Sequence, residues 1–529
     1  SSQERGGLNV TSKDSTGLRD GLPIGEWYSA AERPKPIRDR FAKLEKLRDL
    51  GVPAYSYSFD ATHDLGSALA AYQDGVEGTR VRIAGRLESL RDMGKSAFAH
   101  LGDRSGRLQV YFRRNDLSEL DREVQGLLDL GDWIGVEGEL FRTRTGEVTV
   151  RVEVLELLAK SMRPLPLGKT EITDEGESVV HSGFADVESR YRQRYADLAV
   201  NPDVRAVFVT RARIISALRA KLDGEGYLEV ETPVLQPLYG GAFARPFTTH
   251  HHSLDRTLFL RIADELYLKR LIVGQLDRVY EISKNFRNEG IDRTHNPEFT
   301  MLELYRAYAD YLTMMDTAEE LVTVAAAAVN DELQITYDGH AVDLSRPWKR
   351  IPFFEAIENY AGFEARSADT EELRQRVRDA GRSDADTLSR TKLLDVIFSE
   401  WVEPELVNPT IVFDYPIEMS PLAKPKRGDP GLAERFEVIV AGTELVNAFS
   451  ELNDPIDQWE RFANQVEQRA AGDEEAQSLD EDYVRALEYG LPPTGGLGLG
   501  VDRLVMLLTD RPTIREVILY PIMRDDESD

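Results

Sequence analysis

The sequence contains no cysteine, few lysines and no long apolar run. The absence of Cys from all 529 residues excludes disulfides, thiolate zinc sites, iron–sulfur clusters and cysteine nucleophiles together. No apolar run approaches the roughly 20 residues that a membrane-spanning helix needs. Residues 1–30, rich in Ser, Gly and charge, lack the apolar centre of a signal peptide. We therefore expect a soluble protein of the cytoplasm.

Positive charge is also scarce. The chain carries 65 Lys+Arg against 93 Asp+Glu, and only 14 of the basic residues are Lys. Nucleic-acid binding needs a basic surface, so the net charge of −28 argues against such a partner. Residues 80–165 escape this acidity, with 15 basic and 14 acidic residues. The acidic remainder indicates either a salt-rich environment that screens self-repulsion or an ordinary acidic protein.

The length predicts two to four domains of about 100–200 residues each. Residues 1–36 are expected to form a disordered tail, and residues 37–70 a helical segment with apolar residues at helical spacing. Residues 163–186, which contain Pro and Gly, are expected to form a linker. Residues 187–529 alternate long helical patterns with isolated strands, and a charged helical insertion is expected near residues 350–410.

Residues 71–162 have a different pattern. Between about residues 79 and 158, five short alternating runs such as TRVRIAGRLES and GRLQVYFRR are separated by Gly and charged turns. Five β-type runs within about 80 residues are typical of a small closed barrel.

The first chemically informative segment is FRNEGIDRTHNPEFTMLELY, residues 286–305. Two β-type runs with interleaved charges flank Asn-Glu-Gly and Asn-Pro. The planar guanidinium of Arg287 can bind a carboxylate or a phosphate through two hydrogen bonds. Phe299 and Glu303 fall on the returning run. The segment is either an anion clamp that also stacks on a base or a hairpin with surface salt bridges.

The second segment is TGGLGLGVDRLVMLL, residues 494–508, in which glycines lead directly into a helix. A glycine-rich backbone lets a ligand approach, and a helix N-terminus attracts phosphate. No Gly-Lys-Ser/Thr follows, so the segment is not a P-loop, and its alternating glycines do not fit a dinucleotide fingerprint. The alternative reading is close backbone packing.

The third segment is RFEVIVAGTELVNAFSELND, residues 435–454. Glu437 and Glu444 are expected to face one another across a hairpin, and paired carboxylates suit Mg²⁺. Asn447, Phe449 and Glu451 share one face at the strand period of two. These residues favour a binding site for a polar cation over an apolar core. The alternative is an edge hairpin with solvated glutamates.

These segments resemble the signature motifs of class II aminoacyl-tRNA synthetases. FRNEGIDRTHNPEFTMLE resembles motif 2, GLGLGVDRLVMLL resembles motif 3, and KLDGEGYLEVETPVL, residues 221–235, is similar to motif 1. The segments RYRQRYADL, GGAFARPF, LRIADELYLKRLIVG and NAFSELNDPIDQ are similar to lysyl-tRNA synthetases rather than to their aspartyl and asparaginyl relatives. The resemblance covers about residues 37–524.

The resemblance implies an α+β protein: an N-terminal OB-fold β-barrel that binds the anticodon, followed by a catalytic domain built on an antiparallel sheet flanked by helices. It implies tRNA(Lys), lysine and ATP as ligands, Mg²⁺ as the cofactor, and a homodimer formed through the motif 1 region. In the barrel, it implies that Phe98 stacks on an anticodon base, with Arg86 and Gln109 nearby.

The resemblance also assigns roles within the catalytic domain. It implies that Arg287 and Arg503 are catalytic. The residues implied to bind ATP are Arg287, Glu289, Arg293, His295, Phe299, Gly500 and Arg503. Those implied to bind lysine are Gly241, Glu265, Arg287, Glu303, Tyr305, Asn447, Phe449 and Glu451. Glu437 and Glu444 are implied to bind Mg²⁺.

The implied reaction attaches lysine to tRNA(Lys) in two steps through a lysyl-adenylate. Three alternatives remain: a ligase that lysylates a protein, a synthetase for aspartate or asparagine, and a non-catalytic RNA-binding protein. The barrel argues against the first, Glu451 against the second, and the retained motif charges against the third. One departure is Ala448, where the family usually has Gly. A methyl group is tolerable there if φ is negative.

Overall fold

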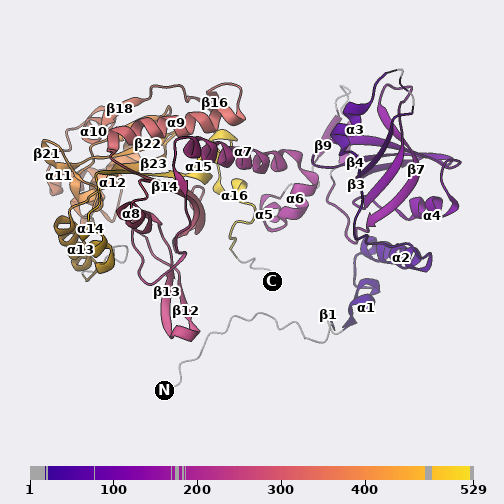
Figure 1. Ribbon diagram of the computed structural model, residues 1–529, viewed down its shortest axis with the longest axis horizontal. Coiled ribbons are helices and arrows are strands. Elements are labelled where there is room, and N and C mark those ends of the chain that lie inside the picture. Colours follow the sequence, from indigo (N-terminus) through magenta and orange to yellow (C-terminus); the bar gives the residue numbers. More distant parts are fainter. Residues whose placement is uncertain are drawn as a thin grey trace. The chain divides into compact units, whose positions relative to one another are not determined.

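The computed structural model describes residues 18–19, 22–74, 76, 78–167, 169–172, 178–181, 184, 186–242, 244–470 and 479–524. The chain divides into two compact units, Ser1–Phe184 and Ala185–Asp529 (Figure 1). Most of the expected tail, residues 1–17, 20 and 21, lies outside the described residues, as do residues 168, 173–177, 182–183 and 185 of the expected linker. No helix among the described residues is long and apolar enough to cross a membrane.

The first unit contains the predicted five-stranded barrel. Its strands are β3 (Arg80–Asp92), β4 (Ser96–Gly102), β5 (Arg107–Arg113), β6 (Trp133–Arg142) and β7 (Val148–Ala159). They close in the order β3-β4-β5-β7-β6, and the β5–β7 pair is parallel. Side chains alternate between a buried and a more exposed position along β4 and β5, as a barrel wall requires. The expectation of an OB-type barrel is confirmed.

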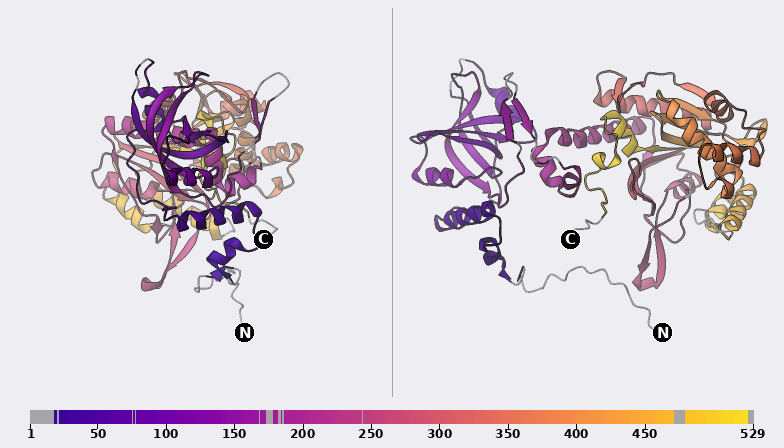
Figure 2. Two further views of the ribbon diagram at one scale, coloured as in Figure 1. Left: turned by 90° about the vertical axis from the view of Figure 1, so that its right-hand side faces the viewer. Right: turned by 180° about the vertical axis from the view of Figure 1, so that it is seen from behind.

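Three helices accompany the barrel: α2 (Lys35–Asp49), α3 (Leu65–Ala71) and α4 (Glu119–Leu127). Leu44 and Leu47 of α2 join the barrel core, and Figure 2 shows this helix below one end of the barrel. A short helix, α1 (Ile24–Ser29), follows the two short strands β1 (Leu18–Arg19) and β2 (Leu22–Pro23). The expectation of a tail reaching residue 36 is therefore wrong from α1 onward.

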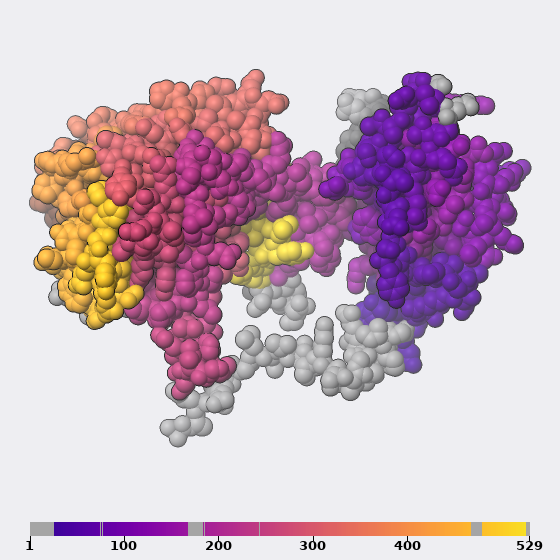
Figure 3. Space-filling view, viewed as in Figure 1, coloured from indigo at the N-terminus to yellow at the C-terminus, as the bar shows by residue number. Residues whose placement is uncertain are grey.

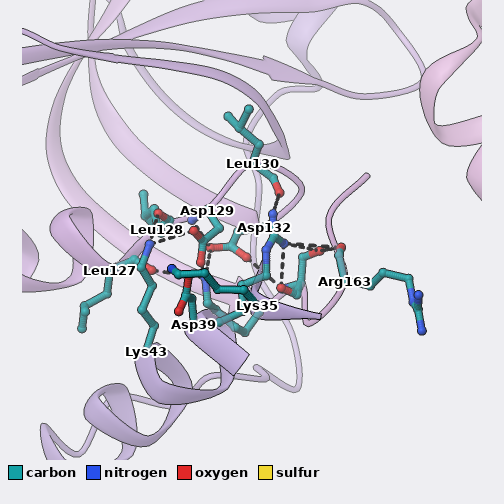
Figure 4. A network of polar contacts seen from close by, with 12 residues as sticks. Lys35, Asp39, Lys43, Leu127, Leu128, Asp129, Leu130, Asp132 and Arg163 are labelled. Carbon is teal, nitrogen blue, oxygen red and sulfur yellow. Dashed lines mark hydrogen bonds and ion pairs between the residues drawn. The ribbon is translucent and has the colours of Figure 1, made fainter. Parts of the chain in front are cut away.

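A buried ion network fastens α2 to the barrel (Figure 4). The ammonium of Lys160 lies 2.6 Å from Asp129 Oδ2 and 2.8 Å from Asp132 Oδ2, and the Lys160 and Asp132 side chains are fully buried. Lys43 of α2 approaches the other oxygen of Asp129 at 2.7 Å. Arg40 of α2 donates to the carbonyl oxygen of Leu130 at 2.7 Å. Helix and barrel thus share one set of charges.

We predict that Lys160→Met lowers the free energy of unfolding of the first unit by about 3–5 kcal/mol, because removing one partner leaves Asp132 buried and unpaired. Lys43→Met is the matched control: Lys43 is partly exposed and shares Asp129, so its loss should cost no more than about 1 kcal/mol. Hydrogen exchange of the β6 and β7 amides in the full chain measures both effects. Equal decreases in the free energy of unfolding for the two variants would show that the buried pair of Lys160 and Asp132 contributes no more than the partly exposed Lys43.

The second unit is built on an eight-stranded sheet. The strands, in spatial order, are β10 (Leu228–Glu229), β14 (Arg278–Phe286), β15 (Glu298–Ala307), β24 (Thr494–Gly500), β23 (Thr443–Ser450), β22 (Arg435–Val440), β19 (Thr410–Phe413) and β18 (Lys349–Pro352). Strands β10 and β18 at the two edges pair in parallel, and the six central strands are antiparallel. The expectation of an antiparallel sheet therefore holds for its centre.

Helices cover both faces of this sheet. On one face, α7 (Pro202–Gly224), α9 (Tyr311–Val329) and α15 (Val501–Leu508) bury Leu302, Leu304, Val446, Leu497 and Leu499 in the largest apolar core. On the other face, α8 (Glu265–Val273), α13 (Pro455–Ala470) and α14 (Glu481–Glu488) pack near Tyr305 and Val279. This second face carries the polar residues that the sequence singled out.

Helices α10 (Phe353–Ala361), α11 (Thr370–Asp379) and α12 (Arg390–Trp401) occupy the expected insertion near residues 350–410 and form a separate core. Strands β12 (Thr248–His251) and β13 (Arg256–Leu260), with β11 (Leu235–Gln236), form a hairpin that projects from the unit (Figure 3). The remaining α-helices and β-strands of the described residues are α5 (Val187–Arg192), α6 (Arg194–Val200), α16 (Ile514–Val517), β8 (Lys169–Ile172), β9 (Ser178–His181), β16 (Gln334–Tyr337), β17 (His340–Asp343), β20 (Pro425–Lys426) and β21 (Asp429–Ala433).

Candidate active site

The glycine-rich strand β24 forms the floor of the candidate site. Gly498 pairs with Glu303 on one side and with Asn447 on the other, and Gly496 pairs with Tyr305 and Phe449. Directly paired residues of neighbouring strands point to the same face of a sheet. The register therefore gathers four of the predicted site residues around two glycines.

The glycines of β24 leave the space that these side chains occupy. A Cβ on Gly496 would lie 2.0 Å from Glu451 Oε1 and 2.5 Å from the ring of Tyr305. A Cβ on Gly498 would lie 2.5 Å from Glu303 Oε1. Their alternation thus serves close approach of neighbouring side chains. Gly500 is different, because a Cβ there would meet only the Arg503 side chain at ordinary contact distance.

Three glutamates and one lysine form a buried group, which we call the acidic cluster: Glu265, Glu303, Glu451 and Lys269. The fully buried ammonium of Lys269 pairs with Glu265, one helical turn earlier on α8, and with Glu451. It also lies 5.3 Å from the ring centre of Phe449 and 5.8 Å from that of Tyr305. The sequence pattern predicts the three glutamates as site residues but not Lys269.

Burial dominates the electrostatics of the acidic cluster. It raises the pKa of both Glu303 and Glu451 well above the ordinary range, and Lys269 opposes this shift at Glu451. Burial also raises the pKa of the neighbouring Asp264 to about 6. Glu451 Oε1 and Asp264 Oδ1 are buried and have no hydrogen-bond partner among the described residues. Unsatisfied buried carboxylate oxygens favour a cationic ligand at this cluster.

Gly241, a predicted ligand of the same group, lies against Glu265. Its φ is +90°, and a Cβ there would be 3.3 Å from the Cβ of Glu265. Asn447 accepts a hydrogen bond from Arg435 at 3.1 Å. Ala448, the departure noted in the sequence, is an extended residue of β23 whose methyl group packs in the core on the opposite face. The substitution therefore leaves the polar face unchanged.

Arg287 directly follows β14, at the edge of the acidic cluster. It is partly buried, and it makes no ion pair within the described ranges of the chain. Its Nε donates to the carbonyl oxygen of Ile262 at 3.4 Å, and its guanidinium lies 5.0 Å from the ring centre of Phe299. Burial lowers the pKa of Arg287, and the charges of Glu289 and Glu444 oppose this shift. The fork of the guanidinium is thus left for an anionic ligand.

Arg503, in the first turn of α15, joins the other predicted phosphate ligands. It donates to the carbonyl oxygen of Glu444 at 2.6 Å and lies 3.2 Å from His295 Nε2. Arginine only donates, so His295 Nε2 accepts, and Nδ1 carries the proton toward Asp292 Oδ2 at 2.8 Å. Arg293 is held by Asp338 at 2.5 Å. Glu289 is solvent-exposed nearby.

The sequence predicts that Glu437 and Glu444 face one another across the hairpin, but in the structure they do not lie directly opposite each other. Glu437 pairs with Asn447 and Glu444 with Ile439, on either side of a register shift between Val438 and Ile439. Burial raises the pKa of Glu437 to about 7, and the charge of Glu444 adds to this shift while Arg435 opposes it. Tyr415 donates to Glu437 at 2.8 Å. The two carboxylates therefore interact, although diagonally.

This carboxylate pair fits a divalent cation that is shared with phosphates. Glu403 lies nearby, and burial, followed by the charges of Glu437 and Glu444, raises its pKa to about 8. Among the described residues, no group of three or more His, Asp or Glu could hold a metal by itself. Mg²⁺ is commonly bound by one or two carboxylates together with substrate phosphates. The donor set matches that mode.

In the first unit, the predicted nucleic-acid ligands lie on the outer barrel wall. Phe98 on β4 stands opposite Tyr111 on β5, with ring centres 4.7 Å apart, and Tyr111 lies 6.0 Å from Phe141. Gln109 donates to Glu147 at 2.7 Å. Arg86 lies over the ring of Trp133 at 5.0 Å. Tyr111 and Phe141 extend the aromatic surface beyond the residues that the sequence predicted.

Comparison with known proteins agrees with both units. Residues 186–524 match the family described as tRNA synthetases class II (D, K and N), and residues 81–158 match the OB-fold nucleic acid binding domain.

Curated relatives extend over nearly the whole chain. A lysine–tRNA ligase of Carboxydothermus hydrogenoformans is 51% identical over 489 residues, which cover 92% of this chain and 98% of the relative. The enzyme of the same name from Pelotomaculum thermopropionicum is 52% identical and covers 93% of this chain and 95% of its own length. A third, from Moorella thermoacetica, is 50% identical over 92% of this chain and 97% of its own.

Proposed function

The chain belongs to the lysine–tRNA ligases of the class II tRNA synthetase family (D, K and N), and from this premise we propose that it forms lysyl-adenylate from lysine and ATP on the polar face of its sheet. We propose further that it transfers the lysyl group from this intermediate to tRNA(Lys). The observation that carries this proposal is the acidic cluster, where Glu451 keeps a buried, unsatisfied carboxylate oxygen above Gly496.

The acidic cluster supports lysine as the amino acid. A buried carboxylate oxygen without a partner is stabilised by an ammonium group and destabilised by another carboxylate. We assign the ε-ammonium of lysine to Glu451 and Tyr305, and its α-ammonium to Glu265, Glu303 and the backbone at Gly241. Phe449 and Asn447 border the aliphatic part of the substrate. Aspartate would meet like charge here, which selects against it.

Arg287 and Arg503 would align the reacting groups. In the first step, a carboxylate oxygen of lysine attacks the α-phosphorus of ATP in line, and pyrophosphate leaves. Arg287 would bind both the lysine carboxylate and the α-phosphate, which brings two anions together and neutralises developing charge. Phe299 would stack on adenine, Glu289 would accept from its amino group, and Arg503 would cover its other side. Gly500 lets the backbone approach there.

Further residues would bind the phosphates that leave. Arg293 and His295 would hold the terminal phosphates, exchanging their present contacts with Asp338 and Asp292. Glu437 and Glu444 would hold Mg²⁺, which supplies positive charge to the phosphates. In the second step, a terminal ribose hydroxyl of the tRNA attacks the activated carbonyl, and AMP leaves with the electron pair of the broken C–O bond. No covalent enzyme intermediate is needed.

The barrel would bind the anticodon, with Phe98 as a stacking platform and Arg86 and Gln109 beside it. Phe98→Ala is expected to raise the KM for tRNA(Lys) about 10- to 100-fold, because stacking contributes about 1–3 kcal/mol per base. Amino-acid activation without tRNA should remain at the wild-type rate. Leu120→Ala, a substitution of an exposed residue on α4, is the matched control. A parallel loss of tRNA charging and activation would contradict an anticodon role.

We also propose that the chain forms a homodimer through residues 221–235. Leu228, Val234 and Leu235 in this segment expose 51%, 39% and 48% of their surface. Burying such side chains stabilises an interface. Light scattering on the full chain should give twice the 59.7 kDa chain mass, whereas the mass of a single chain would refute the proposal.

A further inference from the structure

Lys269 places a positive charge in the acidic cluster, where the proposed function requires the positively charged substrate to bind. Its side chain is fully buried between α8 and the end of β23, and its ammonium pairs with both Glu265 and Glu451. These two carboxylates belong to opposite ends of the proposed lysine site, one for the α-ammonium and the other for the ε-ammonium. Lys269 therefore links the two ends beneath the substrate.

The link through Lys269 also affects the net charge of the acidic cluster. Three glutamates carry up to three negative charges, and Lys269 cancels one of them. When all three glutamates are ionised, two charges remain, which equals the number of ammonium groups on free lysine. Without Lys269 the three carboxylates would face one another at close range in a buried setting, and such groups take up protons instead of staying ionised.

We propose that Lys269 is a positioning residue for lysine recognition: its buried ammonium fixes Glu265 and Glu451 and favours their ionised forms, so that the site matches a substrate with one side-chain cation. This inference rests on the proposed function. Lys269 acts through the two glutamates and does not touch the reacting atoms.

The groups around Lys269 determine how pH tests this role. Those facing it or its partners are Glu265 and Asp264 at the start of α8, Glu303 and Tyr305 on β15, Glu451 after β23, Tyr483 on α14 and Arg435 on β22. Burial acts to lower the pKa of Lys269, but the charges of Glu265 and Glu451 outweigh it and raise this pKa. Tyr483 and Tyr305 have pKa values raised by burial, so they stay neutral and do not replace the lost cation. The glutamates are the groups that respond.

The test compares Lys269→Met with wild type in lysine-dependent ATP–pyrophosphate exchange between pH 6.5 and 8.5. In the variant, the pKa of Glu451 rises further, so protons occupy the site at low pH and leave as the pH rises. The KM for lysine should increase at least about tenfold at pH 6.5, and the increase should become smaller as the pH rises to 8.5, since each unit of pKa changes the ionised fraction up to tenfold. The KM for ATP should change little.

Controls separate this role from simple packing. Lys426→Met removes another lysine of the second unit that pairs with a carboxylate, Asp414, and should leave the lysine KM at the wild-type value at every pH. Lys269→Arg keeps the charge and should keep the wild-type pH profile even if its larger head raises KM uniformly. Lys269→Gln keeps hydrogen-bond donors without charge and should behave like Lys269→Met.

The possible outcomes distinguish two failures. If wild type shows no lysine-dependent exchange, the proposed function itself is wrong. If wild type is active and Lys269→Met or Lys269→Gln raises the lysine KM equally at all pH values, Lys269 is only a packing residue and the inference is overturned. If only Lys269→Arg folds, a wild-type pH profile supports the charge requirement and a shifted profile contradicts it.

Discussion

Arg287→Ala is expected to lower the rate of lysine-dependent ATP–pyrophosphate exchange by about three orders of magnitude or more, because one guanidinium serves both reacting anions. The loss should fall mainly on kcat, since alignment and charge neutralisation matter most in the transition state. Exchange assays at saturating lysine and ATP measure this directly.

Stability gives the control for this variant. Arg287 makes one long hydrogen bond, to Ile262, and no ion pair within the described ranges of the chain. Its removal should therefore leave the melting temperature within a few degrees of wild type, or raise it by relieving the cost of burying a charge. Arg287→Lys keeps the charge without the fork and should recover only a small part of the rate. Exchange near the wild-type rate in folded Arg287→Ala would refute the role assigned to this residue.

Glu451→Gln is expected to raise the KM for lysine about 100-fold, with a smaller effect on kcat. The substitution keeps the shape of the side chain and removes the charge that would pair with the ε-ammonium. Losing a buried charged partner costs about 3–5 kcal/mol, of which Glu303 recovers a part by interacting with the same ligand. Steady-state exchange kinetics with lysine as the varied substrate measure the effect.

The matched control is Glu319→Gln, because Glu319 is also a buried glutamate of the second unit. It lies on α9, with 2% of its surface exposed, and pairs with Arg346 and Arg350. This variant should be less stable and yet keep the wild-type KM for lysine. Similar KM values for Glu451→Gln and wild type would show that the ε-ammonium binds elsewhere.

The strand period made much of the candidate site predictable. Asn447, Phe449 and Glu451 alternate along the sequence, and their alternation places Asn447 and Phe449 on the polar face beside Gly498 and Gly496. The barrel was equally predictable from the sequence, because few folds other than a small barrel are compatible with five alternating runs between turns. In both cases the alternation of residues along a strand determines which side chains share a face, and tertiary packing does not change that pattern.

Other features depend on packing that no local pattern encodes. Glu265 and Lys269 have the spacing of an ordinary solvated ion pair on a helix surface, and only the burial of α8 against β15 and α14 turns the pair into part of a site. The turn after Val440 and the register shift between Val438 and Ile439 place Glu444 opposite Ile439 instead of the predicted partner Glu437. The parallel edge strands likewise depend on long connections whose course the sequence pattern does not reveal.

The most direct test of the account is amino-acid-dependent ATP–pyrophosphate exchange by the full chain, with lysine, aspartate and asparagine compared at low and high salt. High salt is included because a net charge of −28 weakens the compact state and its attraction for anionic ATP unless it is screened. We expect exchange with lysine alone. Exchange with aspartate or asparagine, or with none of the three in folded protein at either salt concentration, would contradict it.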